Sequence, residues 1–267
     1  MKILFIGGDK RMNYAAERLS AEYEVEQFGE KTQGRFSAVV LPLPLTRNGR
    51  EILAPLSDIT LEFGIITRFA DKNAMIFAGG ECAVLTEMCA ENGYIFVNYF
   101  AEEALILKNA ALTAEAASAL LSQSTDGALL GSRSLITGYG RIGRMLAYRL
   151  AANGSSVTIA ARRAEQRTAA ELDGFSSVNI SDIGDALGNI DFIANTVPCA
   201  LFNAEHFSAM KSSAVFIELA TLPEQSSKPL AESHGIQYIY APGLPGKHSP
   251  IAAGEAIAET IADKLNI

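Results

Sequence analysis

Cysteine and histidine are scarce in this chain, with three of each among 267 residues. Cys82, Cys89 and Cys199 show no C-x-x-C spacing and no disulfide framework, which is typical of a protein kept in a reducing compartment. The histidines form no cluster with the spacing of metal ligands, so we expect no metal site.

A net positive charge and long apolar runs are also missing. The net charge of −8 argues against a nucleic-acid partner, because phosphate binding needs a basic surface. No apolar run approaches the ~20 residues that cross a bilayer, and the apolar run after Met1 stops at two glycines, which is typical of a first strand rather than a signal peptide. We therefore expect a cytoplasmic protein with no membrane partner, long enough for two domains.

A glycine-rich motif in the middle of the chain indicates dinucleotide binding. Residues 135–137 form a short apolar strand, and Gly138, Gly140 and Gly143 then give the pattern G-x-G-x-x-G before a helix that ends near residue 152. The first glycine permits a tight turn, the second lets backbone approach a pyrophosphate, and the third lets the helix pack on the strand. The helix N-terminus supplies free N–H groups for the phosphates.

The next strand, residues 157–161, favours NADP over NAD. Its tip normally carries an acidic residue for the ribose 2′-hydroxyl of NAD. Here the tip reads Ala160-Ala161-Arg162-Arg163, and arginine suits charge-assisted contact with a 2′-phosphate. The alternative is that these arginines are only the solvated start of a helix.

We predict that the remaining cofactor contacts come from two places. Arg141 stands at the helix start beside the pyrophosphate, and Asn195-Thr196-Val197-Pro198 follows a fourth strand, although turn chemistry alone also accounts for the proline. The full set of predicted cofactor residues is Gly138, Gly140, Arg141, Ile142, Gly143, Arg162, Arg163, Asn195, Thr196 and Pro198.

Short apolar strands alternate with helices along the whole chain, which predicts parallel sheets covered on both faces. The expected strands are residues 3–6, 23–27, 38–41, 74–77, 94–97, 135–137, 157–161, 191–194, 214–217 and 236–240, and the expected helices include 13–21, 81–91, 102–123 and 250–265. We predict an α/β protein of two doubly wound, Rossmann-like domains joined by a connecting helix. The predicted parts are a flavodoxin-like or Rossmann-like substrate domain (1–112), a connecting helix and linker (113–127), a cofactor domain (128–250), and a C-terminal helix (251–267) that packs back on the first domain.

Several strand-end segments together resemble the A subunit of dipicolinate synthase. They are Ile6-Gly-Gly-Asp9 with the basic pair after it, Asn109 with Thr113 and Glu115, the glycine loop 138–143, Asn195–Pro198, and Ala241-Pro-Gly-Leu-Pro-Gly-Lys247 continued by Pro250 and Ala253-Gly254. The last of these, with the opening segment, is much more specific than the glycine loop. The chain departs from the family pattern at Leu112, Ala116 and residues 219–225, and it is somewhat short.

The resemblance implies a function and a setting. It implies NADP-dependent oxidation of a dihydrodipicolinate-type precursor, derived from 4-hydroxy-tetrahydrodipicolinate of the lysine pathway, to dipicolinate during sporulation. It also implies a partner, the flavoprotein-like B subunit of that synthase, and the cytoplasm of the mother cell of a spore-forming bacterium as location. We expect the chain to form a homo-oligomer as well.

A dicarboxylate substrate needs cationic or N–H-rich partners. Lys10 and Arg11 follow the first strand, and Lys247 ends the specific loop, so we predict that they bind the carboxylates, with Thr113 orienting the ring. A surface salt bridge is the competing interpretation of Arg11.

Glu115 is our candidate proton acceptor, provided that burial raises its pKa, and Asn109 is the second predicted catalytic residue. A carboxylate favoured by the helix dipole is the alternative for Glu115, and N-capping is the alternative for Asn109 and Thr113.

Two other functions stay open on the sequence alone. One is a stand-alone 2-hydroxy-acid or shikimate-type dehydrogenase, which shares the two-domain plan but needs a clear catalytic pair. The other is a cofactor-binding regulatory or assembly subunit whose partner performs the chemistry.

Overall fold

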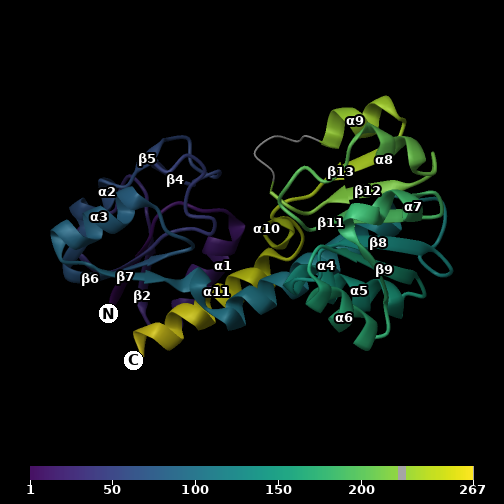
Figure 1. Ribbon diagram of the computed structural model, residues 1–267. Helices are drawn as coiled ribbons and strands as arrows, with labels where there is room; N and C mark the ends of the chain where they lie inside the picture. Colours follow the sequence, from purple (N-terminus) through teal and green to yellow (C-terminus); the bar gives the residue numbers. More distant parts are fainter. Residues whose placement is uncertain (222–226, 267) are drawn as a thin grey trace. The chain divides into compact units, whose positions relative to one another are not determined.

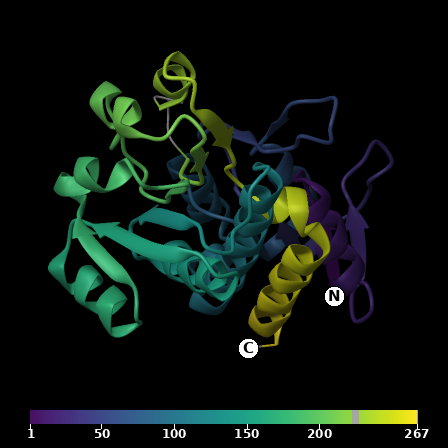
Figure 2. The same cartoon turned by 90° about the vertical axis from the view of Figure 1, so that its right-hand side faces the viewer.

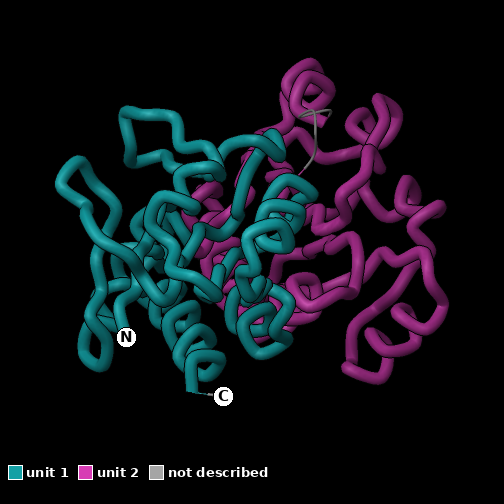
Figure 3. Tube along the Cα trace, turned by 90° about the vertical axis from the view of Figure 1, so that its left-hand side faces the viewer, with its two compact units in different colours: residues 1–109, 246–267 teal, residues 110–245 magenta. Residues whose placement is uncertain are grey.

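The computed structural model describes residues 1–221 and 227–266 of the chain. It separates into two compact units (Figure 3): unit 1 comprises Met1–Asn109 and Gly246–Ile267, and unit 2 comprises Ala110–Pro245. Of the segment 219–225, where the chain departs from the family pattern, residues 222–225 lie outside the described residues.

Unit 1 is built on a five-stranded parallel sheet with the order β2-β1-β3-β6-β7. The strands are β1 (Lys2–Phe5), β2 (Glu24–Gln27), β3 (Phe36–Val40), β6 (Ala70–Ala78) and β7 (Ile95–Asn98). This is the flavodoxin-like order, in which the chain reverses direction across the sheet between the first and third strands. The loop after β1, which ends at Asp9 and leads into the helix that begins with Lys10 and Arg11, therefore leaves the sheet at its topological switch point.

Helices cover both faces of this sheet. One face packs on α1 (Lys10–Leu19), on the short helix η1 (Tyr99–Ala101) and on α11 (Pro250–Leu265), which lies beside α1 (Figures 1 and 2). The other packs on α2 (Ile65–Phe69), α3 (Ala83–Asn92) and the small ladder of β4 (Glu51–Ile52) with β5 (Leu61–Glu62). The chain's last helix thus completes the core that its first residues begin.

Helix α4 (Glu103–Gln123) runs from the end of unit 1 into unit 2. It is long enough to cross a membrane, and its most apolar window of 18 residues has a mean hydropathy of 1.3. Ala114, Ala117 and Leu121 are fully buried in the core of unit 2. Burial in a protein core thus accounts for the apolar composition of this part of the helix.

Unit 2 holds a six-stranded parallel sheet with the order β10-β9-β8-β11-β12-β13. Its strands are β8 (Arg133–Thr137), β9 (Ser156–Ala161), β10 (Ser176–Asn179), β11 (Phe192–Asn195), β12 (Val215–Glu218) and β13 (Gln237–Tyr240). Counted within the unit, this is the order 3-2-1-4-5-6 of a dinucleotide-binding domain, with its switch point between β8 and β11.

The helices of unit 2 lie on opposite faces of its sheet (Figure 1). The second half of α4, α5 (Arg141–Ala152) and α6 (Ala164–Leu172) pack on one face, and α7 (Ile183–Leu187), α8 (Ala204–Ala209) and α9 (Ser227–Ser233) on the other. The remaining short helices are η2 (Ile180–Asp182) and α10 (Leu244–His248).

The predicted fold class is confirmed: both units are doubly wound parallel α/β structures. Strand β10 was not predicted from the sequence, because residues 176–179 are few, polar and at a sheet edge. It also placed the start of α1 at residue 13, whereas Asp9 caps the helix from Lys10 by accepting a hydrogen bond from the Arg11 amide.

Candidate functional site

The glycine loop of unit 2 has the geometry that a dinucleotide requires. Gly138 has a φ of +82°, a conformation that other residues rarely adopt. A Cβ at Gly143 would lie 2.3 Å from the Gly138 carbonyl oxygen, so only glycine lets α5 pack this closely on the turn. The loop can therefore not be rebuilt with larger residues at either position.

Gly140 leaves room for a ligand at the start of α5. It is the N-cap of the helix, no side chain caps the helix there, and a Cβ at this position would meet nothing within 4 Å. The first N–H groups of α5 and the positive end of its dipole thus remain available for an anion. The residues present fit a pyrophosphate.

A cavity of about 470 Å³ opens beside this loop at the carboxyl ends of the strands, where sheets of this type bind ligands. Residues that the sequence predicts for the cofactor line it from three segments, namely Gly138, Gly140, Arg162, Arg163, Thr196 and Pro198. We call this cavity the nucleotide pocket. The predicted residues Arg141, Ile142, Gly143 and Asn195 do not line it.

The rim of the nucleotide pocket at the end of β9 is basic. Arg162 and Arg163 are exposed, and Arg163 forms an ion pair with Glu165 at 3.4 Å in which both side chains are more than half exposed. Arg167 stabilises the turn between them and β9, since its guanidinium donates to the carbonyl oxygens of Ala161 and Arg162 at 2.9 Å each. At such an exposed ion pair the guanidinium remains accessible to an incoming phosphate.

A buried polar network lies under the glycine loop. Thr137, Asn195 and Glu218 end the neighbouring strands β8, β11 and β12 in paired register, and all three side chains are buried. The Asn195 amide nitrogen donates to both carboxylate oxygens of Glu218, at 2.9 and 3.0 Å, and the Thr137 hydroxyl donates to the Asn195 amide oxygen. The network spans the switch point of the sheet.

Sequence reasoning missed Glu218. Its burial raises its pKa to about 7, against the lowering effects of the hydrogen bonds from Asn195 and from the Ala220 amide. The signal in the sequence is a charged residue directly after the apolar run 214–217, at a strand end, since a carboxylate there is buried only when it is hydrogen-bonded.

In unit 1 the predicted carboxylate ligand Arg11 is itself buried and paired. Its guanidinium donates to both oxygens of Asp9, with NH2 to Oδ2 at 2.8 Å, and also to the Leu43 carbonyl oxygen. The competing interpretation of Arg11 is therefore right about the salt bridge and wrong about its place, because the Arg11 side chain is only 7% exposed. The pair joins the loop after β1 to the loop after β3.

Lys10 and Lys247 are exposed and come from segments that touch each other. Lys10 begins α1, and Lys247 lies in α10 directly after Gly246. A Cβ at Gly246 would lie 2.8 Å from Arg11 Nε, so the backbone beside Lys247 rests on the Asp9–Arg11 pair. The two lysines therefore lie on segments that meet at the Asp9–Arg11 pair.

The three predicted residues of α4 lie in the middle of that helix. Because α4 begins at Glu103, the N-capping alternative for Asn109 and Thr113 and the helix-dipole alternative for Glu115 are both wrong. Thr113 is buried, whereas the Glu115 side chain is 56% exposed and forms an ion pair with Arg149 at 3.2 Å. Glu115 is thus not the buried carboxylate that the prediction required, whereas Glu218 of unit 2 is fully buried.

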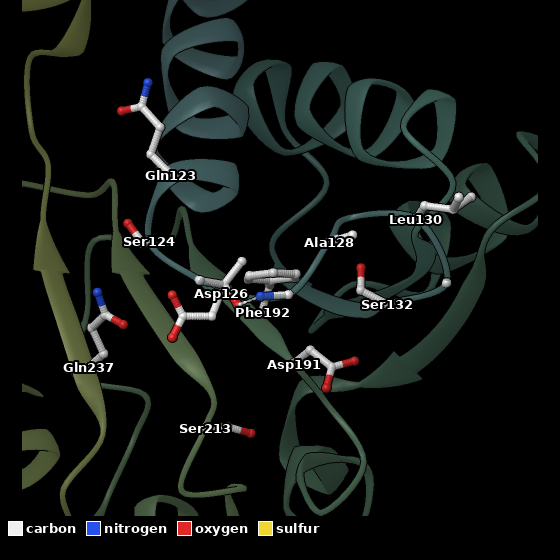
Figure 4. Close-up of a pocket in the computed structure, with 13 residues that line it drawn as sticks. Gln123, Ser124, Asp126, Ala128, Leu130, Ser132, Asp191, Phe192, Ser213 and Gln237 are labelled. Carbon is white, nitrogen blue, oxygen red and sulfur yellow. Dashed lines mark hydrogen bonds between the residues drawn. The ribbon is translucent and has the colours of Figure 1, made fainter.

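A second cavity, of about 810 Å³, lies at the other end of the sheet of unit 2 (Figure 4). Its lining residues precede strands or connect α4 to β8, and they include Asp126, Ser132, Asp191, Ser213 and Gln237. This is the amino end of the parallel strands, away from the glycine loop, and Asp191 is neutralised there by Lys211 at 2.6 Å. None of the predicted site residues lines it.

Comparison with known proteins identifies relatives over the whole chain. Residues 109–227 match the family model of the D-isomer specific 2-hydroxyacid dehydrogenase NAD binding domain. The chain is 27% identical to the A subunit of dipicolinate synthase from Bacillus subtilis (strain 168), over 99% of this chain and 96% of that protein. Crystal structures of the same dipicolinate synthase subunit from Bacillus halodurans (TM-score 0.85, 23% identity, 100% of this chain and 98% of that one) and Bacillus subtilis (TM-score 0.84, 24% identity, 100% and 96%) have the same fold.

These matches confirm the resemblance to the A subunit of dipicolinate synthase and support a dehydrogenase-like role. The matched domain supports a nicotinamide cofactor and an oxidoreductase fold of the NAD(P)-dependent type. The relative is named as one subunit, which implies that it has a partner subunit.

Proposed function

We propose that the chain is the dehydrogenase subunit of a dipicolinate synthase and oxidises a dihydrodipicolinate-type precursor with NADP⁺. The observation that carries this proposal is the similarity to the A subunit of dipicolinate synthase over 99% of the chain, in which the glycine loop and the basic rim occupy one pocket. The activity belongs to the mother-cell cytoplasm of a sporulating bacterium.

The choice of NADP rests on Arg162 and Arg163. Both line the nucleotide pocket at the tip of β9, where an acidic residue would select the 2′-hydroxyl of NAD. Two guanidinium groups instead supply donors for a 2′-phosphate. Arg141, at the first position of α5, lies at the helix end where the pyrophosphate would bind.

The reaction needs little from the protein beyond positioning. After 4-hydroxy-tetrahydrodipicolinate loses water, the dihydropyridine ring loses one hydride and one proton, and the gain of aromaticity makes the step downhill. The nicotinamide, when bound, accepts the hydride. The chain must hold two carboxylates, orient the ring and take the proton.

We assign the carboxylates to the cations of unit 1. Lys10 and Lys247 are exposed and come from adjoining segments, and the Asp9–Arg11 ion pair packs against both of those segments. Asn109 and Thr113, one turn apart along α4, are proposed to orient the ring, whereas Glu115 on the same helix, exposed and paired with Arg149, is not assigned the proton.

A product assay tests the proposal. The purified chain is supplied with the product of the aldol enzyme of lysine biosynthesis and NADP⁺, with and without the flavoprotein-like B subunit proposed as its partner. Formation of dipicolinate together with NADPH supports the proposal. Cofactor binding with no turnover, while the partner alone makes dipicolinate, would instead assign the chain a regulatory role.

The match of residues 109–227 to a 2-hydroxyacid dehydrogenase domain favours one second candidate, a stand-alone 2-hydroxy-acid dehydrogenase. The same assay separates the two functions, because this candidate would oxidise 2-hydroxy acids and leave the cyclic precursor unchanged.

A further inference from the structure

All hydrogen-bonding positions of the Asn195 side-chain amide are occupied by neighbouring groups. Its nitrogen donates to Glu218 and, at 3.2 Å, to the Val197 carbonyl oxygen. Its oxygen accepts from the Thr137 hydroxyl and, at 3.1 Å, from the Val197 amide. An amide group has two donors and two acceptor sites, so this is a complete set, and reversing the amide would place its oxygen against the Glu218 carboxylate.

The same contacts fix one wall of the nucleotide pocket, residues 196–198. Val197 is held through both its N–H and its carbonyl oxygen by the Asn195 side chain. The Thr196 hydroxyl donates to the Thr137 carbonyl oxygen at 2.7 Å, which attaches the wall to the end of β8. A Cβ at Gly138 would lie 2.9 Å from both Thr196 Oγ1 and Val197 Cγ2, so this wall packs directly on the glycine loop.

We propose that Glu218 is a positioning residue of the nucleotide site: its buried carboxylate fixes the Asn195 amide, which in turn holds the wall 196–198 against the glycine loop. Glu218 does not line the nucleotide pocket and acts only through Asn195. This inference rests on the proposed function in so far as that function requires a nicotinamide cofactor in the pocket.

The hydrogen-bond donors around Glu218 favour its ionised form, whereas its burial opposes ionisation. It accepts hydrogen bonds from Asn195 on β11 and, at 3.2 Å, from the Ala220 amide, and on β13 its register partner is Tyr240. The buried Tyr238 hydroxyl, also on β13, has no hydrogen-bond partner among the described residues, and the charge of Glu218 adds to the burial that raises the pKa of that tyrosine. A proton on Glu218 would replace an acceptor with a donor that faces the Asn195 N–H, and would loosen the wall.

Three variants test the inference. Glu218→Leu removes the acceptor, Glu218→Gln keeps an acceptor oxygen but cannot ionise, and Ser134→Ala removes a buried hydrogen bond (to Ser155, 2.7 Å) at the opposite end of β8 as a matched control. NADPH affinity is measured by the fluorescence of the nucleotide. The chain has no tryptophan, so no tryptophan emission contributes to the signal. Hydrogen exchange of the segment 195–201 in the cofactor-free protein reports on the wall itself.

We expect Glu218→Leu to weaken NADPH binding roughly tenfold, as loss of a hydrogen bond to a charged group does, and to speed exchange at Val197. Glu218→Gln should bind within about threefold of the wild type at pH 8. From pH 8 to pH 6 the NADPH affinity of the wild type should fall relative to that of Glu218→Gln. We compare the two affinities as a ratio because the titration of the NADPH phosphate affects both proteins equally. Ser134→Ala should change neither readout.

Unchanged NADPH affinity and exchange in Glu218→Leu would overturn the inference while leaving the proposed function intact. If Glu218→Leu does not fold, a constant ratio between wild type and Glu218→Gln from pH 6 to pH 8 overturns it instead. Failure of the wild type to bind NADPH or NADH would overturn the proposed function and this inference together.

Discussion

Glu218 and Asn195 face each other across paired strands, and both oxygens of the Glu218 carboxylate accept from the Asn195 amide nitrogen, at 2.9 and 3.0 Å. The pair ends two strands of the cofactor-binding sheet and lies under the loop that would hold the pyrophosphate. A fully buried carboxylate at this position makes the stability of unit 2 depend on pH.

Burial raises the pKa of Glu218 to about 7 from an ordinary value of 4.5, so between these values the folded chain holds a proton that the unfolded chain has released. Stability therefore falls as pH rises towards 7. Relative to Glu218→Gln, the wild type should lose about 2 kcal/mol between pH 5.5 and 8, at 1.36 kcal/mol per pH unit up to the folded pKa. Urea denaturation of both proteins at the two pH values measures this, and a constant difference would contradict it.

Replacing both Arg162 and Arg163 with alanine should weaken NADP⁺ binding by roughly 100-fold, because each charge-assisted hydrogen bond contributes about 1.5–3 kcal/mol. Binding of NAD⁺ should change by less than about threefold, since it has no 2′-phosphate. Arg133→Ala, an exposed arginine at the start of β8, is the control and should affect neither cofactor. Titration calorimetry with both cofactors is the measurement, and equal losses would refute the 2′-phosphate assignment.

Two glycines of the loop should behave differently when each is replaced with alanine. A Cβ at Gly143 would overlap the Gly138 carbonyl oxygen, so Gly143→Ala should destabilise unit 2 by about 1–3 kcal/mol. A Cβ at Gly140 meets nothing, so Gly140→Ala should fold normally and lose cofactor affinity only. Thermal unfolding without cofactor separates them, and a large loss of stability in Gly140→Ala would show that the loop is packed differently.

Lys10 is exposed and its neighbour Arg11 is buried, so we expect replacement of Lys10 to affect substrate binding and replacement of Arg11 to affect stability. Lys10→Ala should raise the KM for the dicarboxylate roughly tenfold with little change in stability. Arg11→Ala leaves Asp9 without its buried partner and should destabilise unit 1 by about 3 kcal/mol. Steady-state kinetics and chemical denaturation distinguish the two, and an unchanged KM in Lys10→Ala would remove it from the substrate site.

Both parallel sheets could be predicted from the sequence, because their central strands are short apolar runs that lie between turns rich in glycine and proline. One element that was not predicted, β10, is an edge strand with little apolar surface to bury, so its sequence carries no periodic signal. The β4–β5 ladder was missed for the same reason, since only two residues pair on each strand.

The glycine loop was also predictable, because its glycines are required by a local backbone turn and by close packing between residues near in sequence. The environment of Arg11 was not, because its burial depends on Leu43 and Gly246, which are distant in sequence. Glu218 escaped prediction for a related reason: only strand pairing brings it to Asn195, 23 residues away. Glu115 seemed suited to proton transfer from its motif alone, yet its helix leaves it exposed beside Arg149.

Transfer of the ring's hydride to a nicotinamide held by this chain can be followed directly with an isotope. A precursor deuterated at its ring carbons is oxidised with NADP⁺ by the chain and its partner, and the nucleotide is analysed by mass spectrometry. We predict one deuterium in NADPH for each dipicolinate formed, because hydrogen on the nicotinamide carbon does not exchange with water. Dipicolinate formed with unlabelled NADPH, or with none, would contradict the account.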